Sequence, residues 1–348
     1  MSTPTSIPEL PRKVLGRTGV EVTTVGIGTA WLGLTSTRAD TSDLYLDEDL
    51  AIRSLTAALE EGIKLIDTAA LYVHSRAERI IARVLRDRPD LAEGVIVETK
   101  CCRLPDAQDY SYDGALRSVA GSLERLGVER IELLYIHDPP REALDQVMGP
   151  QGALAALRRL QSEGVVGHIG VASNYPDDNA PYIETGEFEM AVVPDAYSLI
   201  NQIARERIFP AAERFGMGIV AATPLERGLL ALGASGARTG NAEFYARRFS
   251  PVCLAHVEKI EDLCLRHGVS LLAAALQFVT RHPVVATTIP GPRTPDEARA
   301  NARAAREPIP DAFWPELQPL VRTWDIVVTP AISIGGWAET RRPPTAPN

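Results

Sequence analysis

The chain has 348 residues, of which 45% are hydrophobic and 23% are charged, and its formal net charge is −9 at pH 7. This acidic balance argues against nucleic acid and anionic membranes as partners, because both carry the same sign of charge. No apolar stretch is long enough to predict a membrane span, and residues 1–10 lack the pattern of a signal peptide. The four cysteines match no zinc-binding spacing, so we expect a cytoplasmic protein without a metal site (Cys101, Cys102, Cys253 and Cys264).

Strand and helix patterns alternate along the chain. Residues 1–12 carry three prolines and are expected to form a tail, and the alternation in 13–25 around Arg17-Thr18-Gly19 predicts a β-hairpin. Short apolar runs then predict buried strands at 25–29, 64–67, 94–100, 131–137, 168–173, 189–194, 218–222 and 283–289. Helical periodicity predicts helices at 50–61, 77–86, 112–126, 152–162, a short piece before 187, 205–215, 252–266, 270–281 and 295–306.

The eight strand–helix units predict an α/β protein with the (β/α)8 TIM-barrel fold and an N-terminal β-hairpin. An open doubly wound sheet is the competing architecture, but the even spacing of eight units favours the barrel. Residues 35–49 and 225–250 are expected to be loops. We expect one domain over residues 1–348, with 307–348 as an irregular C-terminal extension that is a candidate to lie across one mouth.

Polar side chains stand at the ends of several predicted strands. Asp67 ends the second strand and Tyr72 follows in its loop, Lys100 ends the third strand, and His137 ends the fourth. In a (β/α)8 barrel the active site forms at these carboxyl ends. A single lysine or histidine there is usually structural, whereas four titratable groups of complementary type on successive strands indicate a catalytic site.

These four residue types suit the interconversion of a carbonyl and an alcohol. We expect Lys100 to lower the pKa of Tyr72 below its usual ~10, with Asp67 keeping Lys100 protonated. His137 is expected to donate a hydrogen bond to a substrate oxygen, and Tyr72 to exchange a proton with that oxygen. Because no side chain supplies a hydride, a nicotinamide cofactor is implied.

Short motifs are spread along nearly the whole chain. They are Asp67-Thr68-Ala69 with Tyr72 and Glu78, Thr99-Lys100, 122–127, Ile136-His137, 170–174, Pro224-Leu225 with Gly228-Leu229, and Ile289-Pro290-Gly291 with Arg293 and Asn301. In order and spacing they resemble the aldo-keto reductase superfamily. The resemblance implies that Asp67, Tyr72, Lys100 and His137 form a catalytic tetrad.

A narrower likeness is carried by residues 109–114, 135–139, 273–278 and 309–314. It is to the branch that holds D-threo-aldose 1-dehydrogenase (L-fucose dehydrogenase), L-galactose dehydrogenase and pyridoxal 4-dehydrogenase. Members of that branch oxidise a cyclic hemiacetal to a lactone, or catalyse the reverse. The branch resemblance makes Arg103 a substrate contact, and Trp31 is a candidate wall of the same pocket together with Tyr72 and His137. For Arg103 and Trp31 a plain rim or packing role is about equally expected.

The resemblance also implies a cofactor site. The glycines near Gly28 lack the G-x-G-x-x-G spacing, so we interpret them as a turn. Thr29 would contact the ribose, and Ser173 with Asn174 would hold the nicotinamide carboxamide. The full set implied for the cofactor is Gly28, Thr29, Asp67, Ser173, Asn174, Thr223, Leu225, Gly291, Arg293, Thr294, Glu297 and Asn301.

Some positions depart from the family pattern. Pro194 stands where a glutamine is usual, Ala222 where an aromatic side chain stacks on nicotinamide, and Ala300 where a glutamate is usual. Gly291 and Glu297 stand where many members grip the 2′-phosphate of NADP with lysine and arginine. An acid there repels a phosphate and accepts hydrogen bonds from a ribose diol, which favours NAD, while Arg293 leaves NADP open.

The sequence therefore predicts an NAD(P)-dependent oxidoreductase that acts on a small carbonyl or sugar substrate. Oxidation of an aldose at C1, or of a pyridoxal-like hemiacetal, is the favoured reaction, with Tyr72 as the acid and base. The alternatives are an NADPH-dependent aldehyde or ketone reductase and a nicotinamide-binding regulatory subunit. The intact set of four residues favours an enzyme, and the sequence does not indicate an oligomeric state.

Overall fold

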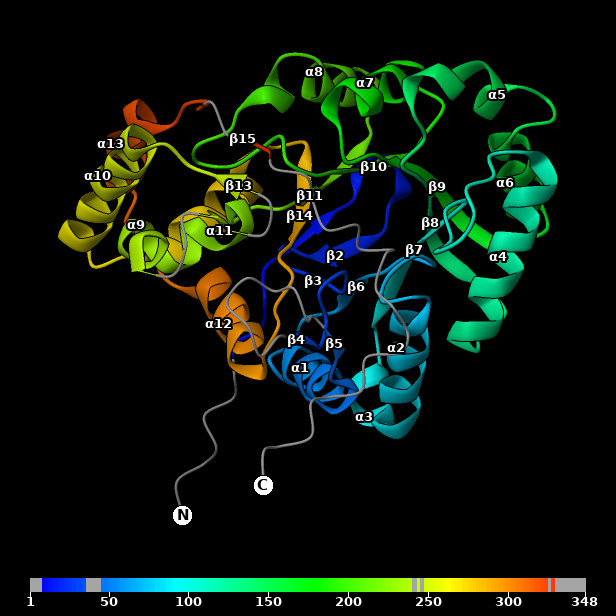
Figure 1. The fold of residues 1–348 in the computed structure, drawn as a ribbon, viewed down its shortest axis with the longest axis horizontal. Helices are drawn as coiled ribbons and strands as arrows, with labels where there is room; N and C mark the ends of the chain where they lie inside the picture. The colour runs from blue at the N-terminus through cyan, green and yellow to red at the C-terminus, as the bar shows by residue number, and fades with distance from the viewer. Residues whose placement is uncertain (1–7, 36–44, 240–242, 245–246, 325–326, 329–348) are drawn as a thin grey trace.

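Eight parallel strands form the centre of the protein, in a computed structural model that describes residues 8–35, 45–239, 243–244, 247–324 and 327–328 (Figure 1). The strands are β3 (Ile27–Gly28), β6 (Leu65–Asp67), β7 (Ile96–Cys101), β8 (Ile131–His137), β9 (Val166–Ala172), β10 (Met190–Val193), β11 (Gly218–Ala222) and β14 (Val285–Ile289). Each pairs in parallel with the next in chain order, and β11 pairs with β14.

The first and last strands meet and close the sheet. Val25 forms a parallel bridge to Thr288. The amide of Gly26 donates to the carbonyl of Thr288 at 2.8 Å, and the amide of Gly28 donates to that of Pro290 at 3.0 Å. The predicted (β/α)8 barrel is therefore confirmed, and the open sheet is excluded.

Helices surround the strands. The main ones are α1 (Glu48–Glu60), α2 (Arg76–Asp87), α4 (Tyr112–Leu126), α6 (Ala153–Ser162), α7 (Pro176–Glu184), α8 (Ile208–Phe215), α10 (Pro251–His267), α11 (Leu271–Arg281) and α12 (Pro295–Arg306). The remaining ones are α9 (Leu229–Thr239), which is kinked, and the short helices α3 (Pro89–Ala92), α5 (Leu144–Met148) and α13 (Phe313–Leu317). Helix α1 packs against α12, blue beside orange in Figure 1, so the ring of helices closes as the strands do.

Local sequence fixes where these helices begin and end. The side chain of Asp47 accepts a hydrogen bond from the Leu50 amide at the start of α1, and Ser111 does the same for Gly114 at the start of α4. Gly127 ends α4 with φ 68°, a left-handed conformation that favours glycine. These capping residues define where each helix begins or ends.

The predicted hairpin lies under the barrel. It is made of β1 (Arg12–Val14), a 3-10 turn at Gly16–Thr18 and β2 (Glu21–Thr23). Leu15 and Val22 are buried among the inward side chains of the barrel. Lys13 Nζ donates to the carbonyls of Thr280, His282 and Val285 at 2.8, 3.1 and 2.7 Å, which ties the hairpin to the end of α11 and the start of β14.

Three sequence predictions need correction. The segment 225–250 is not a continuous loop, because its first half contains a 3-10 turn (Glu226–Gly228) and α9, with Leu229, Leu230 and Ala234 buried. Gly233 and Gly236 dilute the helical pattern there, and Gly233 kinks α9 with φ 75°. The prediction that residues 1–12 form a tail is wrong at its end, because Leu10 is buried, with 4% of its surface exposed, and β1 begins at Arg12.

The C-terminal extension is also more regular than predicted. It contains α13 and a 3-10 turn (Gln318–Leu320), because Phe313 and Leu317 are buried. Past these, the Trp324 amide donates to the Ile200 carbonyl at 3.0 Å. Residues 329–348 and the centre of the predicted loop 35–49 lie outside the described residues, and the ends of that loop pair as β4 (Leu34–Thr35) and β5 (Tyr45–Leu46). The other short strands are β12 (Glu243–Phe244), β13 (Arg247–Arg248) and β15 (Val327–Val328).

Three further features of the described residues concern membrane spans, cysteines and metal ligands. In the described residues no single helix is long and apolar enough to cross a membrane, although α10 and α11, bent by 99°, pass that test of length and composition as a pair. All four cysteines are free and buried. Within the part of the chain that the structure describes, no group of three or more histidine, cysteine, aspartate or glutamate side chains is arranged to hold a metal ion.

Candidate active site

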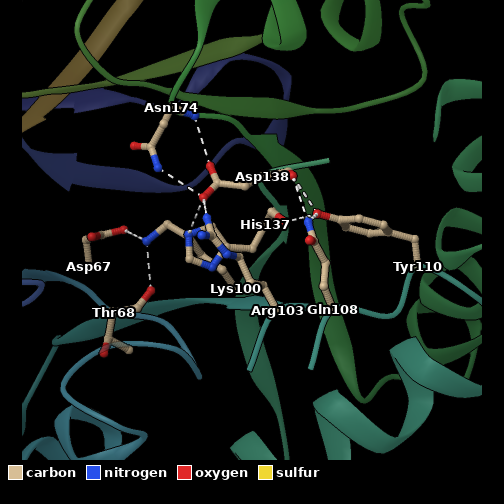
Figure 2. Close-up of polar contacts among 9 residues, drawn as sticks. All are labelled: Asp67, Thr68, Lys100, Arg103, Gln108, Tyr110, His137, Asp138 and Asn174. Atoms are coloured by element: carbon tan, nitrogen blue, oxygen red, sulfur yellow. Dashed lines mark hydrogen bonds and ion pairs between the residues drawn. The ribbon is translucent and has the colours of Figure 1, made fainter. Parts of the chain in front are cut away.

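Three neighbouring strands bring the predicted acid, lysine and histidine together at the carboxyl end of the barrel (Figure 2). Lys100 is 2% exposed, and its Nζ forms an ion pair with Asp67 and donates to the carbonyl of Thr68 at 2.8 Å. Burial alone would lower the pKa of Lys100, but the charge of Asp67 and its neighbours outweighs burial and raises that pKa. Lys100 is therefore a fixed cation, as predicted.

Tyr72 completes this group from the loop after β6. Lys100 Nζ lies 4.6 Å from the centre of the Tyr72 ring, and the rings of Tyr72 and His137 meet edge to face at 5.7 Å. The expectation that Tyr72 has a lowered pKa is wrong once all effects on this group are combined. Burial raises the pKa of Tyr72 to about 12, although the charge of Lys100 acts in the opposite direction. Sequence patterns do not show how fully a side chain at a strand end is shielded from water. The effect of burial on the pKa of Tyr72 could therefore not be anticipated.

The loop that carries Tyr72 has a strained backbone. Val73, His74 and Ser75 have φ of 50°, 52° and 62°, values that side chains other than glycine rarely adopt. Ser75 Oγ donates to the Ala70 carbonyl at 2.6 Å, which bends the loop back toward its strand. Tyr72 itself packs with Trp31 against the buried cluster of Leu34, Val73 and Ala77, so the two predicted pocket residues share one support. Such strain is often stored at functional sites.

His137 is buried at 4% exposure on the end of β8. Burial lowers its pKa to about 3, so the imidazole is neutral over the whole neutral range. Its Nδ1 is buried with no hydrogen-bond partner among the described residues, and so is Oγ1 of Thr68. Buried polar atoms without partners are expected where a ligand supplies them.

Asp138 is the residue that sequence reasoning missed at this mouth. It accepts from the backbone amide and the side-chain amide of Asn174 at 2.9 and 3.0 Å, and it forms an ion pair with Arg103 (Figure 2). Its Oδ2 is 3.7 Å from His137 Nε2. Asp138 has φ 46°, and the hydroxyl of Tyr110 donates to the His137 carbonyl at 2.8 Å behind it. The position directly after His137 was the available signal, and Arg103 and Asn174 are held at the rim through it.

The residues implied for the cofactor fall into two places. Ser173 and Asn174 follow β9, and Thr223 and Leu225 follow β11, all at the carboxyl end of the barrel. Thr29 Oγ1 donates to the Asp67 carbonyl at 2.8 Å, so toward a ribose this hydroxyl can only accept. Gly28 must be glycine, because a Cβ there would lie 2.9 Å from the Ile289 carbonyl oxygen.

The second place is the start of α12. Thr294 caps this helix through the Glu297 amide at 3.2 Å, and Asn301 is buried one turn further on. Glu297 accepts from the Arg293 amide at 2.7 Å and from its guanidinium at 3.2 Å. Gly291 is exposed beside them. The positive end of a helix dipole favours a phosphate, and the unpartnered atoms of Thr68 and His137 suit a polar ring, so the residues present fit a nicotinamide dinucleotide.

The chain is similar to known proteins in both sequence and structure. The model of the Aldo/keto reductase family matches residues 24–322. The chain is 30% identical over 346 residues to pyridoxal 4-dehydrogenase of Microbacterium luteolum, covering 88% of this chain and 96% of that protein. It is 31% identical over 296 residues to D-threo-aldose 1-dehydrogenase of a Pseudomonas species, covering 78% and 88%. A solved aldo-keto reductase of Bacillus halodurans in its holo form aligns with a TM-score of 0.71 at 22% identity, over 91% of this chain and 99% of that one.

Proposed function

The chain belongs to the aldo/keto reductase family and is an NAD(P)-dependent oxidoreductase, and we propose that it oxidises the cyclic hemiacetal of an aldose at C1 to the lactone. A pyridoxal-like hemiacetal is the second member of the same substrate class. The observation that carries the proposal is the buried Lys100–Asp67 pair under the Tyr72 ring, beside the neutral His137. The names of the two relatives at 30% and 31% identity support this choice of substrate.

Tyr72 is the proposed acid and base. In the oxidation direction the substrate O–H bond breaks and its proton passes to the Tyr72 oxygen, while the C1–H electron pair leaves as hydride and a carbonyl forms. The nicotinamide, when bound, supplies the acceptor for that hydride. Lys100 stabilises the phenolate by its charge, and Asp67 keeps Lys100 protonated. Neutral His137 positions the substrate oxygen by a hydrogen bond.

The pKa of Tyr72 sets the pH preference of the two directions. Because burial raises it to about 12, the phenol is protonated at neutral pH and ready to donate. Oxidation needs the phenolate, so its rate is expected to rise as the pH rises. Reduction needs the phenol and is expected to stay flat over the same range. The direction of the pH dependence therefore reports the role of Tyr72.

The start of α12 favours NAD as the cofactor. Glu297 places a carboxyl group in its first turn and accepts hydrogen bonds from both the backbone amide and the guanidinium of Arg293. A 2′-phosphate placed there would meet like charges, whereas a ribose diol can donate to Glu297. Arg103 and Asp138 at the rim offer a paired donor and acceptor to the hydroxyl groups of a sugar, and Trp31 a flat wall.

The test is a turnover screen that follows the absorbance of the reduced nicotinamide. NAD⁺ and NADP⁺ are compared with L-fucose, L-galactose, D-arabinose, pyridoxal and simple alcohols, and the reduced cofactors with aldehydes. Sugar turnover with NAD⁺ is the expected result. Turnover of aldehydes alone, and only with NADPH, would replace the proposal by an NADPH-dependent reductase. Tight cofactor binding with no turnover of any substrate would indicate a regulatory subunit.

A further inference from the structure

A second polar layer lies inside the barrel, one level below Lys100 and His137. Side chains two residues apart on a strand point to the same side. Glu98 precedes Lys100 by two residues on β7, and Tyr135 precedes His137 by two on β8. The register pairs Asp67 with Glu98 across β6 and β7, and Lys100 with Tyr135 across β7 and β8. Glu98 and Tyr135 therefore face the barrel interior beside the Asp67–Lys100 pair.

The contacts within this layer are short and dry. Glu98 and Tyr135 are both 0% exposed, and the Tyr135 hydroxyl donates to Glu98 Oε2 at 2.7 Å. The other oxygen, Glu98 Oε1, is buried with no donor partner among the described residues. The register places the carboxyl groups of Asp67 and Glu98 side by side across β6 and β7, and each shifts the pKa of the other. Two neighbouring carboxyl groups in a dry site do not both ionise, and a proton held by one makes it a donor to the other.

The charges around Glu98 decide which carboxyl holds the proton. The titratable groups that face it are Asp67 from β6, Lys100 from its own strand and Tyr135 from β8. The apolar side chains that are buried in one cluster with Tyr135 include Leu65, Leu133, Ala172, Met190, Val192 and Val220. Lys100 bonds directly to Asp67 and has no bond to Glu98 among the described contacts. The one positive charge therefore stabilises the Asp67 anion, and the proton belongs on Glu98.

The barrel makes room for this arrangement. Tyr135 is the register partner of Gly170 on β9. A Cβ at Gly170 would overlap the Tyr135 ring and crowd Met190. The phenol therefore reaches Glu98 across a space that only glycine leaves open, and the pair is a built feature of the interior.

We propose that Glu98 and Tyr135 are positioning residues of the active site: Glu98 donates its carboxyl hydrogen to Asp67, and Tyr135 holds Glu98 in that orientation. The inference deepens the proposed function, because it rests on Asp67 and Lys100 setting the state of Tyr72. A neutral Glu98 leaves the Asp67–Lys100 pair balanced. An ionised Glu98 adds a negative charge next to Lys100 and opposes formation of the Tyr72 phenolate.

The layer has a pH signature. Burial, followed by the negative charge of Asp67, raises the pKa of Glu98 to about 8. If Tyr72 were the one group that ionises, kcat for oxidation would rise with pH at a constant slope. Because Glu98 begins to ionise at about pH 8, kcat of the wild type should rise less steeply above that pH. The Tyr135 hydroxyl stabilises the Glu98 anion, so its removal should move this break to higher pH.

The experiment compares four variants by the pH dependence of kcat for oxidation. Glu98→Gln keeps a neutral donor toward Asp67 and an acceptor for Tyr135, so kcat at neutral pH should stay within about threefold and the break should vanish. Glu98→Met removes the donor and should lower kcat about 10- to 100-fold, the usual effect of losing a hydrogen bond to a charged group. Tyr135→Phe should keep the break and shift it upward. Tyr182→Phe is the matched control, because its buried ring carries a hydroxyl that donates to the Pro140 carbonyl at 2.8 Å, away from Glu98.

Two readouts do not depend on turnover. Difference infrared spectra should show a protonated carboxyl band at neutral pH that Glu98→Gln lacks and Tyr182→Phe keeps. The folded pKa of Glu98 lies above its unfolded value of ~4.3, so the wild type loses stability as the pH rises between the two values. Tm of Glu98→Gln relative to the wild type should therefore rise over that range.

These outcomes separate the inference from the proposed function. An unchanged pH profile in Glu98→Gln, or no carboxyl band assigned to Glu98, would overturn the positioning role even if Tyr72→Phe is inactive. An active Tyr72→Phe enzyme would sink the proton-transfer role while the infrared and Tm results still report on Glu98. Equal loss of kcat in Glu98→Gln and Glu98→Met would show that a neutral amide donor cannot replace the carboxyl group, and would also overturn the inference.

Discussion

A buried glutamate lies on each face of β7, and the two glutamates have different sets of partners. On the outer face, Glu78 of α2 accepts from the Thr99 hydroxyl at 2.7 Å and from Arg125 Nε of α4 at 2.6 Å. On the inner face, Glu98 has one phenol donor and a second carboxyl as its neighbour. Both glutamates are 0% exposed. The difference teaches that burial of an acid does not mark function; the set of partners does.

The outer pair can be explained by stability alone, since each oxygen of Glu78 has a donor and the charge has a cation. The inner acid is not fully paired, and an incompletely paired buried acid costs folding free energy unless it holds a proton. A protein keeps such a group where the chemistry uses it.

The largest expected effect is on the inner face. Lys100→Met removes the cation that stabilises the Tyr72 phenolate, so kcat should fall by about 10³-fold or more. Cofactor binding, followed by the fluorescence of the reduced nicotinamide, should persist. Lys259→Met on the exposed side of α10 is the control. A Lys100→Met enzyme with kcat within tenfold of the wild type would remove Lys100 from the mechanism.

On the outer face the loss should appear in stability and not in chemistry. Arg125→Met leaves Glu78 buried without its cation, which should lower the free energy of unfolding by about 3–5 kcal/mol in urea titrations. Adding Glu78→Leu removes the stranded charge and should recover most of that loss. At a temperature where the variants are folded, kcat should match the wild type. A fall in kcat larger than tenfold in the folded double variant would contradict the division between the faces.

His137, the next inner position, tests the protonation state at the mouth. Burial holds its pKa at about 3, so it is neutral on both sides of pH 7. His137→Asn should lower kcat by about 10²-fold through loss of a positioned hydrogen bond, while the shape of the kcat profile between about pH 5 and pH 8 stays the same. A profile inflection near pH 6 to 7 that this variant removes would show that the histidine is charged during turnover.

The smallest effect is expected at an exposed acid. Glu297→Gln removes the charge beside Arg293, so the ratio of kcat/KM with NADP⁺ to that with NAD⁺ should rise about tenfold. Asp296→Asn, one residue earlier with a 98% exposed side chain, is the matched control. An equal change in the two variants would mean that the net charge of the helix start, and not Glu297, sets the preference.

The sequence allowed the barrel and the four polar residues at its mouth to be predicted, because strands and helices alternate regularly and because strand ends meet at one place. It also contained the signal for Glu98: an acid two residues before Lys100 in a strand must share its side of the sheet. Glu98 was not predicted as a site residue because it lies inside its strand and not at the strand end. The pKa of Tyr72 was predicted in the wrong direction, because its burial depends on how the loops pack at the carboxyl end of the folded barrel. Helix α9 was missed because Gly233 and Gly236 interrupt its pattern.

The hairpin under the barrel has a consequence for how the chain folds. Lys13 binds the Thr280 carbonyl, 267 residues away, so a segment that is synthesised early is held by one that is synthesised much later. Closing so long a loop is slow, because its entropy is lost before the contact rewards it. Until β14 is made, Leu15 and Val22 have no complete cavity to enter. A chain that stops short of β14 should therefore expose these two side chains and aggregate, whereas one that ends after α13 can still bury them.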